Sequence, residues 1–319
     1  MKIAVLDKNT LTRGDLDFGE IEAIGEVIYC DIKSEEDIIS SCADCDAILC
    51  NKIVISASVM SALPNLKYVG LFATGYNNVD IEAAYAAGIT VTNVPDYSTH
   101  AVAQHTFAMI MHFACRVDEY DCCVKRGEWS KSNTFSYFPY PTDELQGKTL
   151  GIYGYGNIGR KVADIGNAFG MRVVVASRTM HVDCPYPYVG DDIFAMSDYL
   201  TLHCPLTPKT EKLINKKRLS AMKKSAVLIN TARGLLVDEQ ALADALNSGT
   251  IAGAALDTLS CEPPKADNPL LKARNCLITP HIAWAPTETR RRLIGMVAEN
   301  LRAFEGGQPI NVVTGKSAE

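Results

Sequence analysis

A glycine-rich segment is the most chemically informative stretch of the chain. Gly154-Tyr155-Gly156-Asn157-Ile158-Gly159 lies between an apolar run at 149–153 and a helical stretch at 162–170. In that context the first glycine permits a tight turn, the second lets the backbone approach a pyrophosphate, and the third allows close helix–strand packing. The N-terminus of the following helix adds free N–H groups and positive potential. The segment therefore predicts a dinucleotide-binding site.

The end of the next predicted strand bears on the type of dinucleotide. An acidic residue at that place would bind the hydroxyls of the adenosine ribose. This chain has Ser177-Arg178-Thr179 instead. A guanidinium beside a hydroxyl suits a 2′-phosphate better than a bare ribose, which favours NADPH over NADH. The alternative is that Arg178 points into solvent and both cofactors are used.

Three polar residues near later strand ends could act on a small acid. Arg233 follows the apolar run at 226–230, Glu262 follows the run at 252–256, and His281 follows the run at 276–279. An arginine can bind a carboxylate through two hydrogen bonds, and a histidine exchanges a proton near neutral pH. A glutamate beside that histidine would orient the ring and stabilise its charged form. Any one of the three could be a surface or structural residue, so the prediction rests on their combination.

These residues must be positioned by strands and helices, and apolar runs alternate with helical stretches along most of the chain. Most runs are continuous rather than alternating, as in parallel strands that are covered on both faces. The class is therefore α/β, and eleven strands indicate two sheets. Strands are predicted at 3–6, 27–30, 47–50, 68–72, 90–94, 149–153, 173–176, 199–203, 226–230, 252–256 and 276–279.

Two segments in the middle of the chain do not fit a simple strand–helix alternation. Residues 101–115 are apolar nearly all round, which predicts a helix buried between domains or subunits. Residues 116–146 are polar and aromatic without a clear strand, which predicts a long functional or intersubunit loop.

Composition limits the possible partners. The net charge is −6, hydrophobic residues make up 47% and charged residues 21%, as in an ordinary globular protein. The absence of basic clusters argues against nucleic acid or an anionic membrane as partner, and no apolar run reaches the length of a membrane span. The eleven scattered cysteines predict reduced thiols and, without a signal-peptide pattern, a cytoplasmic protein. Cys42 and Cys45 form a single CxxC, too little to predict a metal site.

Several motifs in order resemble the D-isomer-specific 2-hydroxyacid dehydrogenases over nearly the whole chain. Besides the glycine-rich segment, they are ATGYNNVD at 73–80, NVPDYSTHAVAQHTF at 93–107, HCPLTPKT at 203–210, NTARG at 230–234, LDTLSCEPP at 256–264 and PHIAWA at 280–285. The resemblance implies two doubly wound parallel sheets, with a Rossmann-type cofactor domain (98–283) inserted into a flavodoxin-like substrate domain (1–97 and 284–319). It also implies a homodimer that meets through the buried helix and the following arm.

The resemblance further implies roles for individual residues. Arg233 would bind the substrate carboxylate and polarise the carbonyl, His281 would be the acid/base, and Glu262 its partner. The backbone of Thr74 and Gly75 would hold the substrate carboxylate. Residues expected at the cofactor are Thr74, Gly154, Gly156, Asn157, Ile158, Gly159, Ser177, Arg178, Cys204, Thr231, Ala232, Asp257 and His281. No metal is expected, and the other five histidines are assigned structural parts.

The implied activity is hydride transfer between NAD(P)H and a small 2-oxo or D-2-hydroxy acid. The aromatic run at 135–149 and Trp284-Ala285 look most like hydroxypyruvate reductase/glycerate dehydrogenase sequences, with glyoxylate/glycolate as a further pair of acids. A D-lactate-type dehydrogenase is an alternative. A second alternative, of another class, is an NAD(H)-sensing protein related to transcriptional corepressors.

Overall fold

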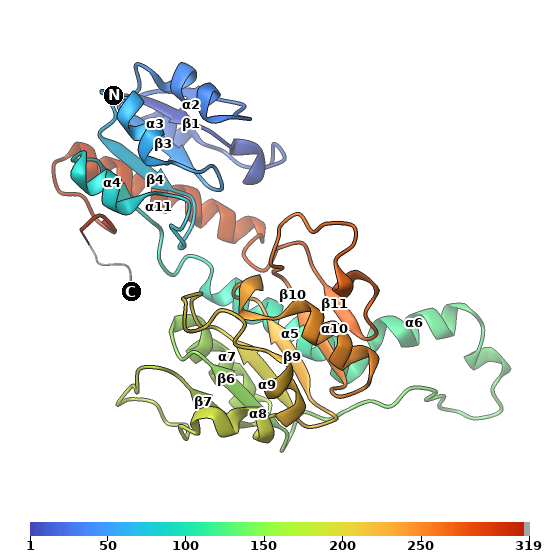
Figure 1. Cartoon of the computed structure of the whole chain (residues 1–319). Coiled ribbons are helices and arrows are strands. Elements are labelled where there is room, and N and C mark those ends of the chain that lie inside the picture. The colour runs from blue at the N-terminus through green and yellow to red at the C-terminus, as the bar shows by residue number, and fades with distance from the viewer. Residues whose placement is uncertain (316–319) are drawn as a thin grey trace. The chain divides into compact units, whose positions relative to one another are not determined.

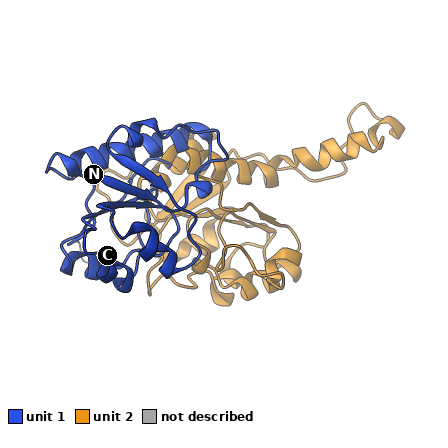
Figure 2. Ribbon diagram, turned by 90° about the horizontal axis from the view of Figure 1, so that it is seen from above, with its two compact units in different colours: residues 1–98, 285–319 blue, residues 99–284 orange. Residues whose placement is uncertain are grey.

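Two compact units make up the computed structural model, which describes residues 1–315. Unit 1 contains Met1–Ser98 and the C-terminal segment from Ala285, and unit 2 contains Thr99–Trp284 (Figure 2). Unit 2 is therefore inserted into unit 1. The chain crosses at 98–99 and at 284–285, where the sequence predicted crossings at 97–98 and 283–284.

Unit 1 is built on a five-stranded parallel sheet. Its strands are β1 (Lys2–Val5), β2 (Glu26–Tyr29), β3 (Ala47–Cys50), β4 (Tyr68–Leu71) and β5 (Thr90–Thr92). The order β2-β1-β3-β4-β5 is that of flavodoxin-like folds, as expected. Every residue of β3 and β4 is buried, which explains why these runs are apolar without alternation.

The helices of unit 1 cover this sheet. They are α1 (Gly19–Glu22), α2 (Glu35–Cys42), α3 (Ala57–Ala62), α4 (Ile81–Ala86) and the C-terminal α11 (Thr287–Glu305), with a 3-10 turn at Lys8–Thr10. Ser34 starts α2 through a capping box with Asp37. The C-terminal helix α11 returns to the N-terminal sheet and packs against β4 (Figure 1), where the Tyr68 and Phe304 ring centroids lie 4.7 Å apart.

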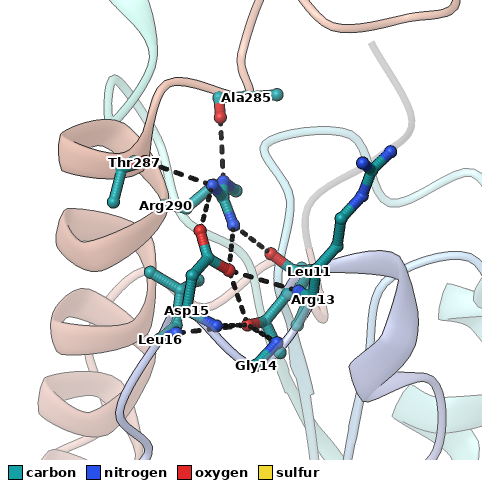
Figure 3. Close-up of polar contacts among 9 residues, drawn as sticks. Leu11, Arg13, Gly14, Asp15, Leu16, Ala285, Thr287 and Arg290 are labelled. Atoms are coloured by element: carbon teal, nitrogen blue, oxygen red, sulfur yellow. Dashed lines mark hydrogen bonds and ion pairs between the residues drawn. The ribbon is translucent and has the colours of Figure 1, made fainter.

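Arg290 of α11 fixes the edge of unit 1 where the chain re-enters it. Its guanidinium donates to both carboxylate oxygens of Asp15, at 3.0 and 2.7 Å, and to the Leu11 carbonyl at 3.0 Å (Figure 3). Its Nε donates to the carbonyl of Ala285 at 2.8 Å. Arg292, two residues further along, donates to the carbonyl of Tyr97 at 2.7 Å. Arg290 and Arg292 thus hold the two segments of unit 1 that lead to the inserted unit.

Unit 2 contains a six-stranded parallel sheet. Its strands are β6 (Thr149–Tyr153), β7 (Arg172–Ala176), β8 (Tyr199–Leu202), β9 (Val227–Asn230), β10 (Gly253–Leu256) and β11 (Cys276–Ile278). The order is β11-β10-β9-β8-β6-β7. Beyond β7, a single parallel bridge joins Val175 to Tyr188, so Tyr188 stands where the third strand of a Rossmann sheet would lie. All eleven predicted strands are present, displaced by at most two residues at their ends.

The helices of unit 2 form a layer on each face of its sheet. Ordered by residue number, they are α5 (Thr99–Cys115), α6 (Val117–Lys125), α7 (Asn157–Ala168), α8 (Ile193–Met196), α9 (Lys216–Ala221) and α10 (Glu239–Asn247), with 3-10 turns at Trp129–Lys131, Gly190–Asp192, Gly234–Leu236 and Pro269–Lys272. One core cluster joins α5 and α7 to the sheet, with Phe107, Leu150 and Val162 among its members. A second cluster joins α8–α10 to the opposite face, through Phe194 and Leu242.

The middle of the chain contains two helices. The apolar surface of α5 packs against α7 and β9 within unit 2, and its predicted burial between domains or subunits stays a prediction. The segment after α5 is not irregular from its start, because α6 occupies Val117–Lys125. Two ion pairs on its surface, Arg116–Glu119 and Asp121–Lys125, support that helix at the spacing of one turn. Together, α6 and the following chain project from the rest of unit 2 (Figures 1 and 2).

Among residues 1–315, no helix has both the length and the apolar character needed to cross a membrane.

Candidate active site

The ends of parallel strands bring the predicted residues of unit 2 to one edge of its sheet. Backbone hydrogen bonds continue past the strands and fix the segments that follow them. The N–H of Gly154 donates to Ala176 at 2.8 Å, that of His203 to Tyr153 at 2.8 Å, and that of Asp257 to Asn230 at 2.9 Å. The glycine-rich segment and the segments carrying Arg233 and His281 therefore lie on the edge where α/β proteins bind ligands.

The glycine-rich segment fits a dinucleotide pyrophosphate. Gly154 has a φ of 101°, and a Cβ at this position would lie 2.6 Å from the backbone nitrogen of Cys204. A Cβ on Gly159 would collide with the carbonyl oxygen of Gly154, so this glycine allows α7 to pack on the strand. Gly156 differs from both, because a Cβ there would meet nothing within 4 Å. Its open space lies at the N-terminus of α7, where no side chain caps the helix.

The strand β7 ends beside this segment and carries the predicted ribose-binding residues. Ser177 is half-buried directly after the strand, and Arg178 is exposed. No carboxylate occupies the two positions that follow β7, so a 2′-phosphate would meet a hydroxyl and a guanidinium there.

The residues after β8 line the same edge but are poor acids and bases. Burial raises the pKa of the Cys204 thiol to about 11, so this thiol stays protonated near neutral pH. Burial lowers the pKa of the neighbouring His203 to about 3, which keeps its imidazole neutral. These groups can shape a binding surface but cannot shuttle a proton.

The loop after β9 presents Arg233 on a fixed backbone. The buried side chain of Asn230 accepts a hydrogen bond from the Ala232 N–H at 3.0 Å and donates to the Arg233 carbonyl at 2.8 Å. The next residue, Gly234, presses directly on the backbone of Leu259, where any Cβ would collide. Because Leu259 belongs to the loop that leads to Glu262, this close approach places the two loops together.

Glu262 and His281 are in direct contact. The His281 Nδ1 lies 2.6 Å from one carboxylate oxygen of Glu262, and the other oxygen accepts the Leu259 N–H at 2.9 Å. Both side chains are partly exposed, at 29% for His281 and 37% for Glu262. The carboxylate therefore orients the ring through Nδ1, and Nε2 is the nitrogen left to exchange a proton.

Asp257 anchors the backbone that carries His281. This aspartate is 1% exposed, and its carboxylate accepts the Thr279 hydroxyl at 2.6 Å and the N–H groups of Ile282 and Ala283 at 2.9 and 2.8 Å. The N–H of His281 also donates to the Asp257 carbonyl at 2.9 Å. This anchor holds His281 in a left-handed conformation with a φ of 53°, which is uncommon for a side chain of this size.

A pocket of about 250 Å³ joins these groups within unit 2. Its lining combines the three polar residues predicted from the sequence with apolar and hydroxyl side chains: Leu206, Arg233, Gly234, Leu235, Thr258, Leu259, Ser260, Glu262 and His281. Arg233, Glu262 and His281 therefore share one cavity, with a cation and an acid/base side chain around space for a small molecule.

Thr74 and Gly75 lie in unit 1, in the loop that follows β4. The Thr74 hydroxyl holds this loop by donating to the Val94 carbonyl at 2.7 Å, and Asn93 holds it by donating to the Thr74 carbonyl at 2.7 Å.

Thr231 and Ala232 lie in unit 2 beside Arg233, and the Thr231 hydroxyl is 3.2 Å from that of Thr106. Within residues 1–315, no three His, Cys, Asp or Glu side chains are arranged to hold a metal ion.

The sequence did not indicate the residues that support the site. Asn230 is the last residue of a strand predicted at 226–230, and His105 is one of the five histidines assigned structural parts. In the structure His105 Nε2 lies 3.0 Å from the Thr279 hydroxyl and 3.6 Å from Asp257, so it backs the segment that carries His281. The only signal for Asn230 was its place in the NTARG motif, and a polar residue at the end of an apolar run is easily read as a loop.

Comparisons with known proteins show the family of this chain. The family model for the NAD binding domain of D-isomer specific 2-hydroxyacid dehydrogenases matches residues 107–283. A hydroxypyruvate reductase from Blautia hydrogenotrophica is 42% identical over 98% of this chain and 99% of its own length. A glyoxylate reductase from Aeropyrum pernix is 42% identical over 87% of this chain and 85% of its own. The crystal structure of an acyclic imino acid reductase, Bsp5, in complex with NADPH and D-Arg has a TM-score of 0.87 at 32% identity, covering 98% of this chain and 100% of that one.

The family model covers the unit that carries the glycine-rich segment, and the hydroxypyruvate reductase matches this chain from end to end. The chain therefore belongs to the D-isomer specific 2-hydroxyacid dehydrogenases, oxidoreductases that transfer a hydride between a nicotinamide cofactor and a 2-hydroxy or 2-oxo acid.

Proposed function

We propose that this enzyme reduces hydroxypyruvate or glyoxylate, with NADPH as the preferred hydride donor. The observation that carries the proposal is the 2.6 Å contact between Glu262 and His281 in a pocket that Arg233 also lines. The pocket is small, and two similar proteins carry the names of reductases for these two acids. Both acids have a carboxylate next to a carbonyl, which suits an arginine and a proton donor placed together.

His281 acts as the acid/base group. In the reducing direction its Nε2 donates a proton to the carbonyl oxygen at C2 of the substrate, and in the oxidising direction it accepts the proton of the hydroxyl. The carboxylate of Glu262 binds Nδ1, so the ring keeps one orientation and its positive charge is stabilised until the proton leaves. The nicotinamide, when bound, supplies the hydride in one direction and accepts it in the other.

Arg233 binds the substrate carboxylate and polarises the reacting carbonyl. Its side chain lines the pocket, its backbone carbonyl accepts a hydrogen bond from Asn230, and its guanidinium donates to the Ala232 carbonyl at 2.7 Å. The backbone N–H groups of Thr74 and Gly75 hold the same carboxylate from unit 1 in this proposal. Unit 1 is then the substrate domain and unit 2 the cofactor domain.

The cofactor is held by the edge of the unit 2 sheet. Gly154, Gly156, Asn157, Ile158 and Gly159 receive the pyrophosphate. Ser177 and Arg178 receive the adenosine ribose and its 2′-phosphate, while Cys204, Thr231, Ala232 and Asp257 line the nicotinamide side. Arg178 can add one or two charge-assisted hydrogen bonds of roughly 1.5–3 kcal/mol each, which corresponds to a preference for NADPH of about tenfold or more.

Steady-state kinetics test the proposal. Oxidation of NADPH and of NADH is followed with hydroxypyruvate, glyoxylate, pyruvate and oxaloacetate. The highest kcat/KM is expected with NADPH and one of the first two acids. A Ser177→Asp variant should shift the preference toward NADH, because a carboxylate repels the 2′-phosphate. Fastest turnover of pyruvate would favour a D-lactate-type enzyme, and no turnover of any acid would favour a nucleotide-sensing protein.

We also propose a cytoplasmic homodimer that meets through α5, α6 and the arm. Exposed apolar side chains support the dimer, since Phe135 is 95% exposed, Phe138 77% and Val117 66%. The cytoplasmic location rests on the eleven scattered cysteines of the sequence. Analytical ultracentrifugation of the intact chain tests the dimer, and a monomer at micromolar concentration would contradict it.

A further inference from the structure

The segment between β7 and Tyr188 carries the proposed ribose-binding residues at its start. Residues 177–187 form neither helix nor strand. Val175 holds the far end of the segment, because it accepts the Val189 N–H and donates to the Pro187 carbonyl, each at 2.9 Å. A segment of this length between two fixed points can adopt many conformations, so its own contacts decide where Ser177 and Arg178 lie.

Tyr155, the second residue of the glycine-rich segment, packs against several side chains of residues 177–188. It is 3% exposed, and its ring centroid lies 5.9 Å from that of His181, 6.3 Å from that of Tyr186 and 6.5 Å from that of Tyr188. The Tyr188 hydroxyl in turn accepts the backbone N–H of His181 at 2.9 Å. The aromatic rings thus bind this segment to the turn that receives the pyrophosphate.

An ion pair on the surface also joins α7 to residues 177–187. Arg160, in the first turn of α7, donates to both carboxylate oxygens of Asp183, at 2.6 and 3.0 Å. The guanidinium also lies over the Tyr155 ring, 4.9 Å from its centroid. Hydrogen bonds from Arg160 lower the pKa of Asp183, so the pair is charged at neutral pH. Exposed ion pairs contribute little unless their geometry is bidentate or stacked, and this pair is both.

We propose that Arg160, Asp183 and Tyr155 are positioning residues that set the discrimination between NADPH and NADH, by fixing residues 177–187 so that Ser177 and Arg178 face the adenosine ribose. The inference rests on the proposed cofactor site. It assigns the discrimination to residues that do not themselves touch the 2′-phosphate.

Selectivity for NADPH follows because some contacts of the proposed site serve both cofactors and others serve the 2′-phosphate of NADPH alone. The glycine-rich segment and the residues after β8–β10 are available equally to both cofactors. In the proposed site, the 2′-phosphate is bound by the segment after β7 alone. If the segment is loosened by loss of the ion pair, it must be ordered again when NADPH binds. Immobilising one long side chain such as Arg178 then lowers the affinity for NADPH roughly 2- to 10-fold. NADH loses much less, since it gains no charge-assisted contact from Arg178.

Two single substitutions separate positioning from simple electrostatics. Arg160→Met removes a positive charge and leaves Asp183 unpaired. Asp183→Asn removes a negative charge and leaves Arg160 unpaired. Both break the ion pair, but they change the local charge in opposite directions. If only charge mattered, Arg160→Met would weaken NADPH binding and Asp183→Asn would strengthen it, because the 2′-phosphate is an anion.

The experiment measures the dissociation constants of NADPH and NADH by titration calorimetry on the intact enzyme, so it does not depend on turnover. Asp191→Asn is the matched control. Asp191 pairs with Arg218 at 3.1 and 3.3 Å, and Arg218 lies 4.9 Å from the Phe194 ring centroid, so the same kind of stacked pair is broken elsewhere in unit 2. Circular dichroism and thermal unfolding show whether each variant is folded.

The expected result is a Kd for NADPH that rises about 2- to 10-fold in both Arg160→Met and Asp183→Asn, with a change below about twofold for NADH and for the control. Tighter NADPH binding by Asp183→Asn would overturn the inference, as would equal losses for both cofactors or no change in either variant. The wild-type ratio of the two constants reports on the proposed NADPH preference separately. A wild type that prefers NADH refutes that preference, whereas the inference depends on how the ratio changes in the variants.

Discussion

Asp257→Asn is the sharpest test of how His281, the proposed acid/base residue, is held. The substitution keeps the shape of the side chain but replaces one acceptor oxygen by an NH2 group. Asp257 accepts hydrogen bonds on both oxygens, from Thr279 and Ile282 on one and from Ala283 on the other. An asparagine has one acceptor oxygen, so it can accept the hydrogen bonds of only one of the two carboxylate oxygens. At least one charge-assisted bond is therefore lost, and the NH2 group faces a buried N–H or O–H donor.

The magnitude follows from these contacts. A charge-assisted hydrogen bond contributes about 1.5–3 kcal/mol, and a buried donor left without an acceptor costs about 1–3 kcal/mol. The free energy of unfolding should therefore fall by about 2–5 kcal/mol, with a decrease in Tm of about 2–4 °C for each kcal/mol. The segment with His281 loses its anchor, and a displacement of about 1 Å lowers kcat by up to about 100-fold.

The assay combines thermal unfolding, kcat with the best 2-oxo acid, and the Kd of NADPH. We expect lower stability and lower kcat, with a cofactor affinity within about threefold of the wild type. Asp238→Asn is the control, because Asp238 caps α10 through the Ala241 N–H at 3.1 Å, and asparagine caps a helix as well as aspartate does. Loss of NADPH affinity with unchanged stability and kcat would refute the reasoning, because Asp257 would then serve the cofactor without anchoring the His281 segment.

Three further outcomes are expected. His281→Asn should bind NADPH normally and lower kcat by about 10²–10⁴-fold, and a rate near that of the wild type would remove His281 from the mechanism. Arg233→Gln should raise KM for the oxo acid far more than KM for the cofactor, and equal increases would point to a structural role. Arg290, and then Thr12, hold the pKa of Asp15 well below its ordinary 3.8. Because a lowered pKa stabilises the folded state above the unfolded pKa of about 4, the stability lost in Asp15→Asn should be largest at neutral pH and shrink toward about pH 2.5 in urea unfolding. A loss that does not change with pH would contradict this.

The strands and their division into two sheets could be predicted from the sequence because the signal is local. The run Ala47–Cys50 is apolar at every position, and all four residues are buried in the sheet. The helix α6 was missed for the opposite reason. Only Cys123 of its nine residues is buried, so its sequence carries no apolar stripe that distinguishes a helix from a polar loop.

The candidate site was predictable to the extent that strand ends meet at one edge of a parallel sheet. That rule places Arg233, Glu262 and His281 near one another, and the resemblance to a family adds an expected role for each. The rule does not predict which oxygen of Glu262 meets which nitrogen of His281, or that His105 reaches Thr279 across 174 positions of sequence. Such contacts depend on rotamers and on the packing of loops against each other, and no periodicity in the sequence records them.

The supporting residues of the site share one physical arrangement. Asn230 ends β9, and Asp257 follows β10, whose last residue pairs with Asn230 in register; both side chains are almost fully buried. The Asn230 side chain hydrogen-bonds the Arg233 loop, which follows its own strand, and the Asp257 side chain hydrogen-bonds the His281 segment, which follows the neighbouring strand β11. Buried polar groups are costly unless fully paired, so each loop is confined to the conformation that satisfies its anchor. The two side chains proposed to meet the substrate, Arg233 and His281, can therefore remain at least partly exposed while their backbones are ordered before any ligand binds.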